Sequence, residues 1–129
     1  MAKRILIVDD DADIREATQL CLEITGHWEV LKAANGPDGI AIAQAERPDA
    51  ILLDMMLPGM DGMTILKKLR ENPTTQTIPI VILTAKVQSS EQNQFEQLAV
   101  ASVITKPYDP LTISDQISAA LPSLKKLSS

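Results

Sequence analysis

The 129-residue chain has very little cysteine and few aromatic residues. Its single cysteine, Cys21, excludes an intramolecular disulfide framework and a cysteine-rich metal site, and a reducing cytoplasm is the simplest location. Aromatic residues make up only 2% of the chain, so the core must be aliphatic. No uncharged apolar run is long enough to span a bilayer, and Asp9 and Asp10 interrupt the only early apolar run. We therefore expect no signal peptide and no membrane insertion.

Basic residues are also in the minority: 12 of them face 17 acidic ones, which gives a net charge of −5. Such a chain is not expected to bind nucleic acid directly, because affinity for phosphate backbones depends on Lys and Arg. Apolar residues make up 45% and charged residues 22%, as in ordinary globular proteins. The length fits a single domain over residues 1–129, with a core at about 3–121 and a frayed tail at 122–129.

Short apolar runs alternate with segments of helical periodicity along the whole chain. The expected strands are 5–8, 28–33, 50–54, 79–84 and 102–105. The expected helices are 14–24, with Gly26 as a stop, then Pro37 to before Pro48, Asp61 to Asn72, 89–98, and Asp109 or Pro110 to Leu121. Apolar stripes are formed by Ile14, Ala17, Thr18, Cys21, Leu22 and Ile24 in the first helix and by Ala41, Ile42 and Ala45 in the second.

This alternation predicts an α/β fold with a doubly wound parallel sheet and helices on both faces. Right-handed crossovers leave few topologies for five strands. The flavodoxin-like order 2-1-3-4-5 fits best, with its switch point between the first and third strands.

The residues that end the strands are the most informative feature of the chain. Asp9 and Asp10 follow the first strand, Asp54 ends the third, Thr84 ends the fourth, and Lys106 follows the fifth. In a parallel sheet these ends share one edge, where ligands bind. Clustered carboxylates need a cation, and Mg²⁺ prefers such oxygen ligands. Asp54 is then a plausible nucleophile towards phosphorus, with Thr84 and Lys106 holding the other phosphate oxygens.

Each of these residues also has a simpler interpretation when it is taken alone. An isolated Asp at a strand end is usually a cap or turn residue, and Asp11 or Asp13 is expected to cap the first helix. Lys106 alone would be a surface charge. His27 is interpreted as a surface turn residue, and Cys21 as a core residue. It is the combination at these spacings that predicts a site.

Four ordered segments resemble the receiver (CheY-like) domains of bacterial two-component response regulators. They are residues 5–10, 54–62, 80–85 and 105–108, and the resemblance covers about residues 3–121. It implies that Asp54 accepts a phosphoryl group from a histidine kinase or phosphotransferase. Thr84 and Lys106 would contact that group, and the Lys106–Pro107 bond would be cis. It also implies a Mg²⁺ site, where Mn²⁺ could substitute, formed by Asp9, Asp10, Asp54 and the backbone carbonyl of Met56.

The sequence departs from the family pattern at two places. Val103 stands where receivers often carry an aromatic switch residue, and Ala99-Val100-Ala101 replaces the usual Gly-Ala turn. In receiver domains, two positions border the path by which an attacking water reaches the phosphorus, and here they are Met56 and Lys86. Neither side chain has a strong hydrogen-bond acceptor that could orient this water. The resemblance therefore implies a slow self-dephosphorylation.

Two other functions are compatible with parts of the sequence. A dehalogenase-type phosphatase would use the Asp-x-Asp at residues 9–11, but it needs a larger body and leaves Asp54 unexplained. A flavin-binding protein would need a Ser-, Thr- or Gly-rich loop after the first strand, where this chain is acidic. We therefore expect a non-enzymatic signalling module, without a DNA-binding output domain, that binds a downstream protein or a second copy of itself through the fourth helix, fifth strand and fifth helix.

Overall fold

The computed structural model describes residues 3–57, 59–85, 89–106, 108–109 and 112–121. The expected tail at 122–129, Lys86 and the expected cis bond between Lys106 and Pro107 lie outside these residues. None of the helices in the described part is long and apolar enough to cross a membrane.

Strands and helices alternate in the order that the sequence predicts. The strands are β1 (Arg4–Val8), β2 (Glu29–Ala33), β3 (Ala50–Asp54), β4 (Ile80–Thr84) and β5 (Ser102–Thr105). The helices are α1 (Ala12–Gly26), α2 (Gly36–Glu46), α3 (Gly62–Glu71), α4 (Ser89–Gln97) and α5 (Ile113–Ala120). All strand pairs are parallel and the order is β2-β1-β3-β4-β5, which confirms the predicted fold class.

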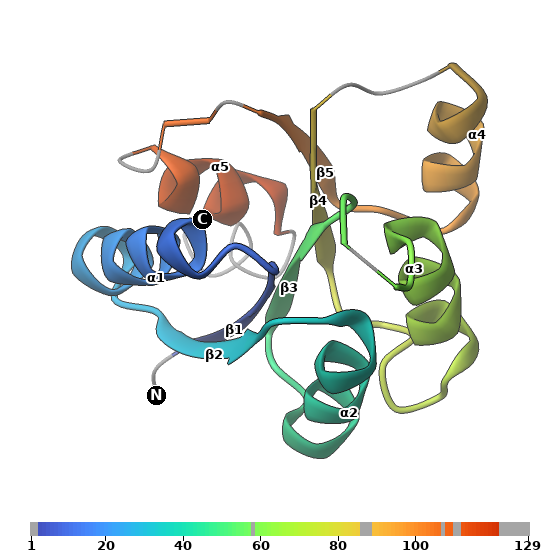
Figure 1. Ribbon diagram of the computed structural model, residues 1–129, viewed down its shortest axis with the longest axis horizontal. Coiled ribbons are helices and arrows are strands. Elements are labelled where there is room, and N and C mark those ends of the chain that lie inside the picture. Colours follow the sequence, from blue (N-terminus) through green and yellow to red (C-terminus); the bar gives the residue numbers. More distant parts are fainter. Residues whose placement is uncertain (1–2, 58, 86–88, 107, 110–111, 122–129) are drawn as a thin grey trace.

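The sheet separates two layers of helices (Figure 1). Helices α1 and α5 cover one face, and α2, α3 and α4 cover the other. Because side chains alternate along a strand, Ile5 and Ile7 of β1 join the core under α1 and α5, whereas Leu6 and Val8 join the core under α2, α3 and α4. Both cores are aliphatic except for Trp28 and Phe95, as the composition requires.

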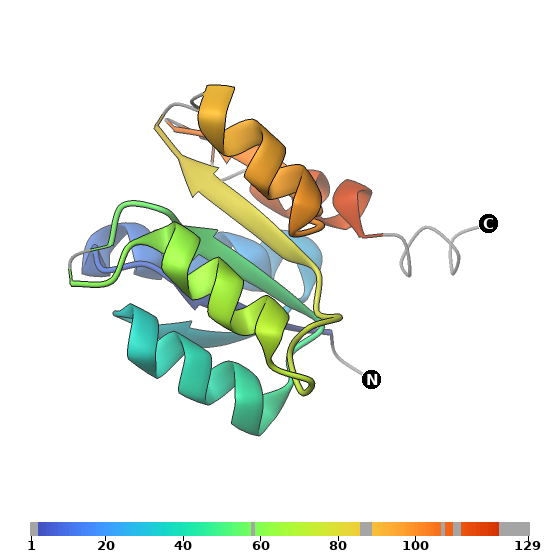
Figure 2. The same ribbon diagram turned by 90° about the vertical axis from the view of Figure 1, so that its right-hand side faces the viewer.

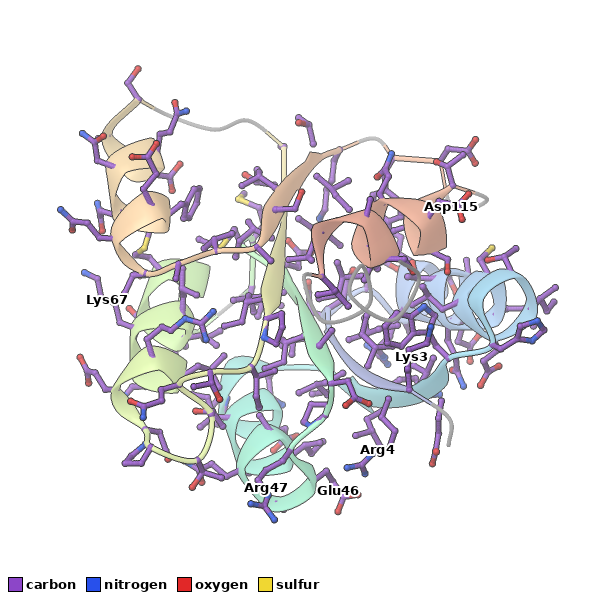
Figure 3. The ribbon with its side chains drawn as sticks, turned by 180° about the vertical axis from the view of Figure 1, so that it is seen from behind. Lys3, Arg4, Glu46, Arg47, Lys67 and Asp115 are labelled. Carbon is purple, nitrogen blue, oxygen red and sulfur yellow. The ribbon has the colours of Figure 1, made fainter. Side chains whose placement is uncertain are left out.

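Polar side chains fix where the helices begin. The Asp11 carboxylate accepts hydrogen bonds from the backbone N–H groups of Asp13 and Ile14, and Asp61 accepts one from Thr64. The end of α1 differs slightly from the prediction, because His27 and not Gly26 adopts the left-handed conformation, with φ of 56°. Arg4, the first residue of β1, forms an ion pair of 3.2 Å with Glu46, the last residue of α2 (Figure 3).

The predicted apolar stripe of α1 is only partly buried. Thr18 and Leu22 face the core, but Ile14 is 38% and Ile24 64% exposed. Cys21 is only partly buried, so its interpretation as a core residue is not confirmed. One helix can bury only the side that meets the sheet, and the apolar residues of α1 extend around more than that side.

The predicted apolar face of α2 is only partly correct, because Ile42 packs against the core under α2, α3 and α4. Ala41 and Ala45 are exposed, whereas Gly39 and Ala43 are buried. Here the helix lies very close to β1: a Cβ on Gly39 would be 2.9 Å from Cγ2 of Val8. Since apolar residues occur on every side of α2, their spacing could not reveal that small residues form the contact.

Several element boundaries also differ from the prediction by a few residues, and those of β2 and α5 are examples. β2 begins at Glu29, one residue later than expected, although Trp28 is buried. α5 begins at Ile113 instead of near Asp109 or Pro110. The carbonyl of Asp109 accepts hydrogen bonds from the backbone N–H and hydroxyl of Thr112, so a turn precedes the helix.

Candidate functional site

The candidate site lies at the carboxyl ends of the strands. Figure 2 shows the arrowheads of the strands at one edge of the sheet. Asp9 follows β1, Asp54 is the last residue of β3, Thr84 is the last residue of β4, and Lys106 follows β5. In the strand register, Asp54 lies beside Leu83 and Thr84 beside Thr105. Residues far apart in the sequence therefore meet at this edge.

Three carboxylates form the acidic part of the site. One oxygen from each of Asp9, Asp10 and Asp54 lies within 4.8 Å of the others. Asp9 and Asp54 are buried, and Asp10 is exposed. Burial raises the pKa of Asp9, and the negative charge of Asp54 raises it further, against a backbone hydrogen bond from Asp11 that lowers it. The hard oxygen donors and the net negative charge of the site fit a divalent cation such as Mg²⁺.

Lys106 supplies the positive charge of the site. Its Nζ lies 2.8 Å from Oδ2 of Asp54, and the Asp54 side chain is almost fully buried. Burial by itself would lower the pKa of Lys106, but the hydrogen bond and charge of Asp54 outweigh it, and the pKa is raised. The ammonium group is therefore held in its charged form beside the carboxylate.

Backbone groups and Arg15 orient the two buried carboxyl-bearing residues. Oδ1 of Asp54 accepts a hydrogen bond of 2.9 Å from the N–H of Met56, and Oδ1 of Asp9 accepts one of 2.9 Å from the N–H of Asp11. The guanidinium of Arg15, on α1, donates a hydrogen bond of 2.7 Å to the backbone carbonyl of Asp9. Nothing in the sequence pattern singles out Arg15, because its contact is with a backbone oxygen.

Thr84 is also at this edge. It is buried, and its carbonyl accepts a hydrogen bond of 2.8 Å from the backbone N–H of Lys106. This bond continues the pairing of β4 and β5 by one residue beyond Thr105. The start of the segment that carries Lys106 is thereby attached to the end of β4.

A second contact fixes the segment after Lys106. The hydroxyl oxygens of Thr18 and Tyr108 are 2.7 Å apart, which joins α1 to the segment between β5 and α5. Burial raises the pKa of the Tyr108 hydroxyl, although its bond with Thr18 acts in the opposite direction. The sequence analysis assigned no role to this pair. A threonine within the apolar stripe of a helix was the available signal, because a buried hydroxyl requires a hydrogen-bonding partner.

The two departures from the family pattern have structural consequences. Val103 is partly buried and lines a groove of about 510 Å³ between β5 and α5. Ala99 adopts a left-handed conformation with φ of 55°, a conformation that favours glycine. Met56 is 67% exposed, so its side chain extends from the edge of the site.

Comparisons with known proteins agree with this arrangement. Residues 5–118 match the model of the response regulator receiver domain. The chain is 38% identical to the protein PilH of Pseudomonas aeruginosa over 118 residues, which cover 92% of this chain and 97% of PilH. It is 39% identical to the phosphate regulon transcriptional regulatory protein PhoB of the same organism, and that match covers 94% of this chain but only 52% of PhoB.

A solved structure shows the same arrangement of the chain. The chemotaxis protein CheY4 of Vibrio cholerae superimposes with a TM-score of 0.86 at 28% identity, over 94% of this chain and 100% of that one. A family match over most of the chain, relatives above one-third identity and a shared fold all agree. The chain therefore belongs to the response regulator receiver domain family.

Proposed function

We propose that this receiver domain carries a signal by accepting a phosphoryl group on Asp54. The donor is a phosphohistidine of a histidine kinase or histidine phosphotransferase. A carboxylate oxygen of Asp54 forms a bond to phosphorus, the bond between phosphorus and the imidazole nitrogen breaks, and the leaving imidazole takes up a proton. The product is an aspartyl phosphate.

The observation that supports this proposal most directly is the ion pair between Lys106 and Asp54. A buried carboxylate at the switch point of the sheet has one cation 2.8 Å from its oxygen, where it can also contact a transferred phosphoryl group. We assign the same task to Thr84, through its hydroxyl. It ends the neighbouring strand β4 and is buried beside this edge.

We also propose a Mg²⁺ site, at which Mn²⁺ is a substitute. Its ligands would be Asp9, Asp10, Asp54 and the backbone carbonyl of Met56. The three carboxylates have the clustering and oxygen chemistry that such an ion needs. When bound, the ion offsets the charge of the carboxylates and of the phosphoryl oxygens.

The output of the domain is proposed to be protein binding through α4, β5 and α5. β5 is the edge strand of the sheet, and the groove beside Val103 lies between β5 and α5. The partner would be a downstream protein or a second copy of the chain. We further propose that residues 3–121 act as one unit in the cytoplasm, and that the only reactions the domain promotes are its own phosphorylation and dephosphorylation.

Phosphorylation with a small donor tests the acceptor residue. Incubation with acetyl phosphate and Mg²⁺ is expected to add one phosphoryl group, measured by intact mass. Asp54→Asn should remain unmodified, and chelation of the Mg²⁺ should abolish labelling of the wild type. Asp115→Asn, an exposed change on α5 (Figure 3), is the matched control and should label normally. Labelling of Asp54→Asn to the wild-type extent would show that the acceptor is another residue.

A further inference from the structure

The contact between Thr18 and Tyr108 joins two parts of the chain that are 90 residues apart in sequence. Thr18 lies within α1 and its side chain is buried. Tyr108 is partly buried, packs against the core under α1 and α5, and is the only tyrosine in the chain. The distance of 2.7 Å between the two oxygens is that of a normal O–H···O hydrogen bond. The two hydroxyls are therefore hydrogen-bonding partners at a position where Thr18 is buried and Tyr108 partly buried.

The position of this bond relative to Lys106 gives it a further consequence. β5 ends at Thr105, and the N–H of Lys106 donates a hydrogen bond to the carbonyl of Thr84, which attaches the next residue to the end of β4. Tyr108 lies two residues beyond Lys106 and is attached to a different element, α1. Lys106 thus lies between one anchor on the sheet and one on a helix, while its side chain reaches Asp54.

We propose that Thr18 and Tyr108 are positioning residues, whose hydrogen bond holds the segment after β5 so that the ammonium of Lys106 stays at Asp54. This inference rests on the proposed function and adds two residues to it. We assign neither hydroxyl a contact with the phosphoryl group, and both act through the position of Lys106. Loss of the bond frees the segment on the side of Lys106 that the sheet does not hold. Phosphoryl transfer should then slow, because the cation is in place for a smaller fraction of the time.

Two conservative changes remove the bond without removing bulk. Tyr108→Phe keeps the ring, and Thr18→Val keeps the branched shape of the side chain. The measurement is the rate of Asp54 phosphorylation as a function of acetyl phosphate concentration, at saturating Mg²⁺. Each variant is expected to lower the maximal rate by about 3- to 10-fold, the effect of losing one hydrogen bond. The donor concentration at half-maximal rate should change less.

Two further variants distinguish positioning from general loosening of the fold. Thr18→Ser retains the hydroxyl and should react at close to the wild-type rate. Ser114→Ala is the matched control, because it removes a buried hydrogen bond of 3.2 Å to Trp28 that also joins distant parts of the chain. Ser114→Ala should leave the rate unchanged. The variant with both Tyr108→Phe and Thr18→Val should be no slower than the slower single variant, because both changes remove the same bond.

The outcomes separate this inference from the function on which it rests. If wild type is not phosphorylated on Asp54, the proposed function fails. If wild type is phosphorylated and Tyr108→Phe reacts at the wild-type rate, the positioning role is wrong. An equal loss in Ser114→Ala, or independent losses that multiply in the double variant, would also overturn it.

Discussion

The carboxylate of Asp54 has a contact on each of its oxygens. Oδ1 accepts a hydrogen bond from the N–H of Met56, and Oδ2 accepts one from Lys106. A phosphoryl group that becomes bonded to one of these oxygens competes with the contact that the oxygen already has. The backbone N–H is fixed by the chain, whereas the lysine side chain has four flexible methylene groups. Lys106 is therefore the contact that can move with a transferred phosphoryl group.

Lys106→Ala tests whether this movement links phosphorylation to a change of conformation. The variant should accept the phosphoryl group more slowly and lose most of the changes in backbone amide shifts that phosphorylation causes in the wild type. The lost charge-assisted contact is worth roughly 1.5–3 kcal/mol. The NMR comparison uses Lys67→Ala as its control, because Lys67 is an exposed lysine on α3 (Figure 3). Equal shift changes in wild type and Lys106→Ala would contradict the role of Lys106.

Met56 is expected to affect a second property, the lifetime of the phosphorylated state. Its thioether has no strong hydrogen-bonding group that could orient an attacking water, and its exposure means that a polar replacement will not disturb the core. Met56→Asn should hydrolyse its aspartyl phosphate about fivefold faster, the effect of one hydrogen bond of about 1 kcal/mol to the water. The decay is followed by intact mass after the donor is removed. A wild-type decay at least as fast as that of Met56→Asn would refute the shielding argument.

At the scale of the elements, the side chain of Arg70 joins α3 to the segment before β4 and to the turn between α4 and β5. The guanidinium of Arg70, on α3, donates hydrogen bonds to four backbone carbonyls in the segments before β4 and after α4. One of these carbonyls belongs to Ala99, the residue in the left-handed conformation. Burial lowers the pKa of Arg70, but arginine still remains charged at ordinary pH. The turn between α4 and β5 is thus held from α3, although its sequence lacks the usual glycine.

Ala99→Gly should therefore stabilise the protein by about 0.5–1 kcal/mol, because glycine adopts a positive φ without the steric cost that alanine has. The measurement is the free energy of unfolding from urea denaturation. Ala101→Gly is the matched control: Ala101 lies two residues on, outside the residues with positive φ, and packs against the core. That change should destabilise. A loss of stability in Ala99→Gly as large as in Ala101→Gly would show that the turn has no strain to relieve.

At the scale of the whole molecule, the sheet connects the site to the surface. Thr84 is the last residue of β4, and Lys106 follows β5. These two strands are neighbours at the edge of the sheet, next to α4 and α5. Helices α2 and α3 cover β1 and β3 instead, around Leu6, Val8, Ile65 and Leu66. A change at Thr84 and Lys106 should therefore affect the face formed by α4, β5 and α5 more than the surface formed by α2 and α3.

Hydrogen exchange measured with and without acetyl phosphate tests this expectation. Phosphorylation should alter the exchange of peptides from α4, β5 and α5 and leave α2 largely unchanged. Asp54→Asn treated with the same donor provides the baseline, and its exchange should not change. If phosphorylation changed the hydrogen exchange of peptides from α2 and α3 only, the proposed output face would be wrong.

The amino-acid sequence alone was enough to predict the order of the elements, the parallel sheet and the residues that lie at its carboxyl edge. Strand-end residues are local features, since a buried run such as Ile51 to Leu53 ends where the first polar residue, Asp54, follows it. In a parallel sheet all such strand ends lie at one edge, so their proximity can be predicted without knowing how the side chains pack. The start of α3 was predictable for the same reason, because the cap at Asp61 depends on neighbouring residues alone.

Only the tertiary structure decided which sides of α1 and α2 are buried and which distant groups meet. Ile24 is exposed and Gly39 buried because the sheet determines how closely each helix approaches, which apolar spacing does not encode. The partners of Thr18 and Arg70 lie up to 90 residues away and include backbone carbonyls, which every residue possesses. The sequence does not identify the two partners of such a contact, because its energy depends on where the folded chain places the two groups.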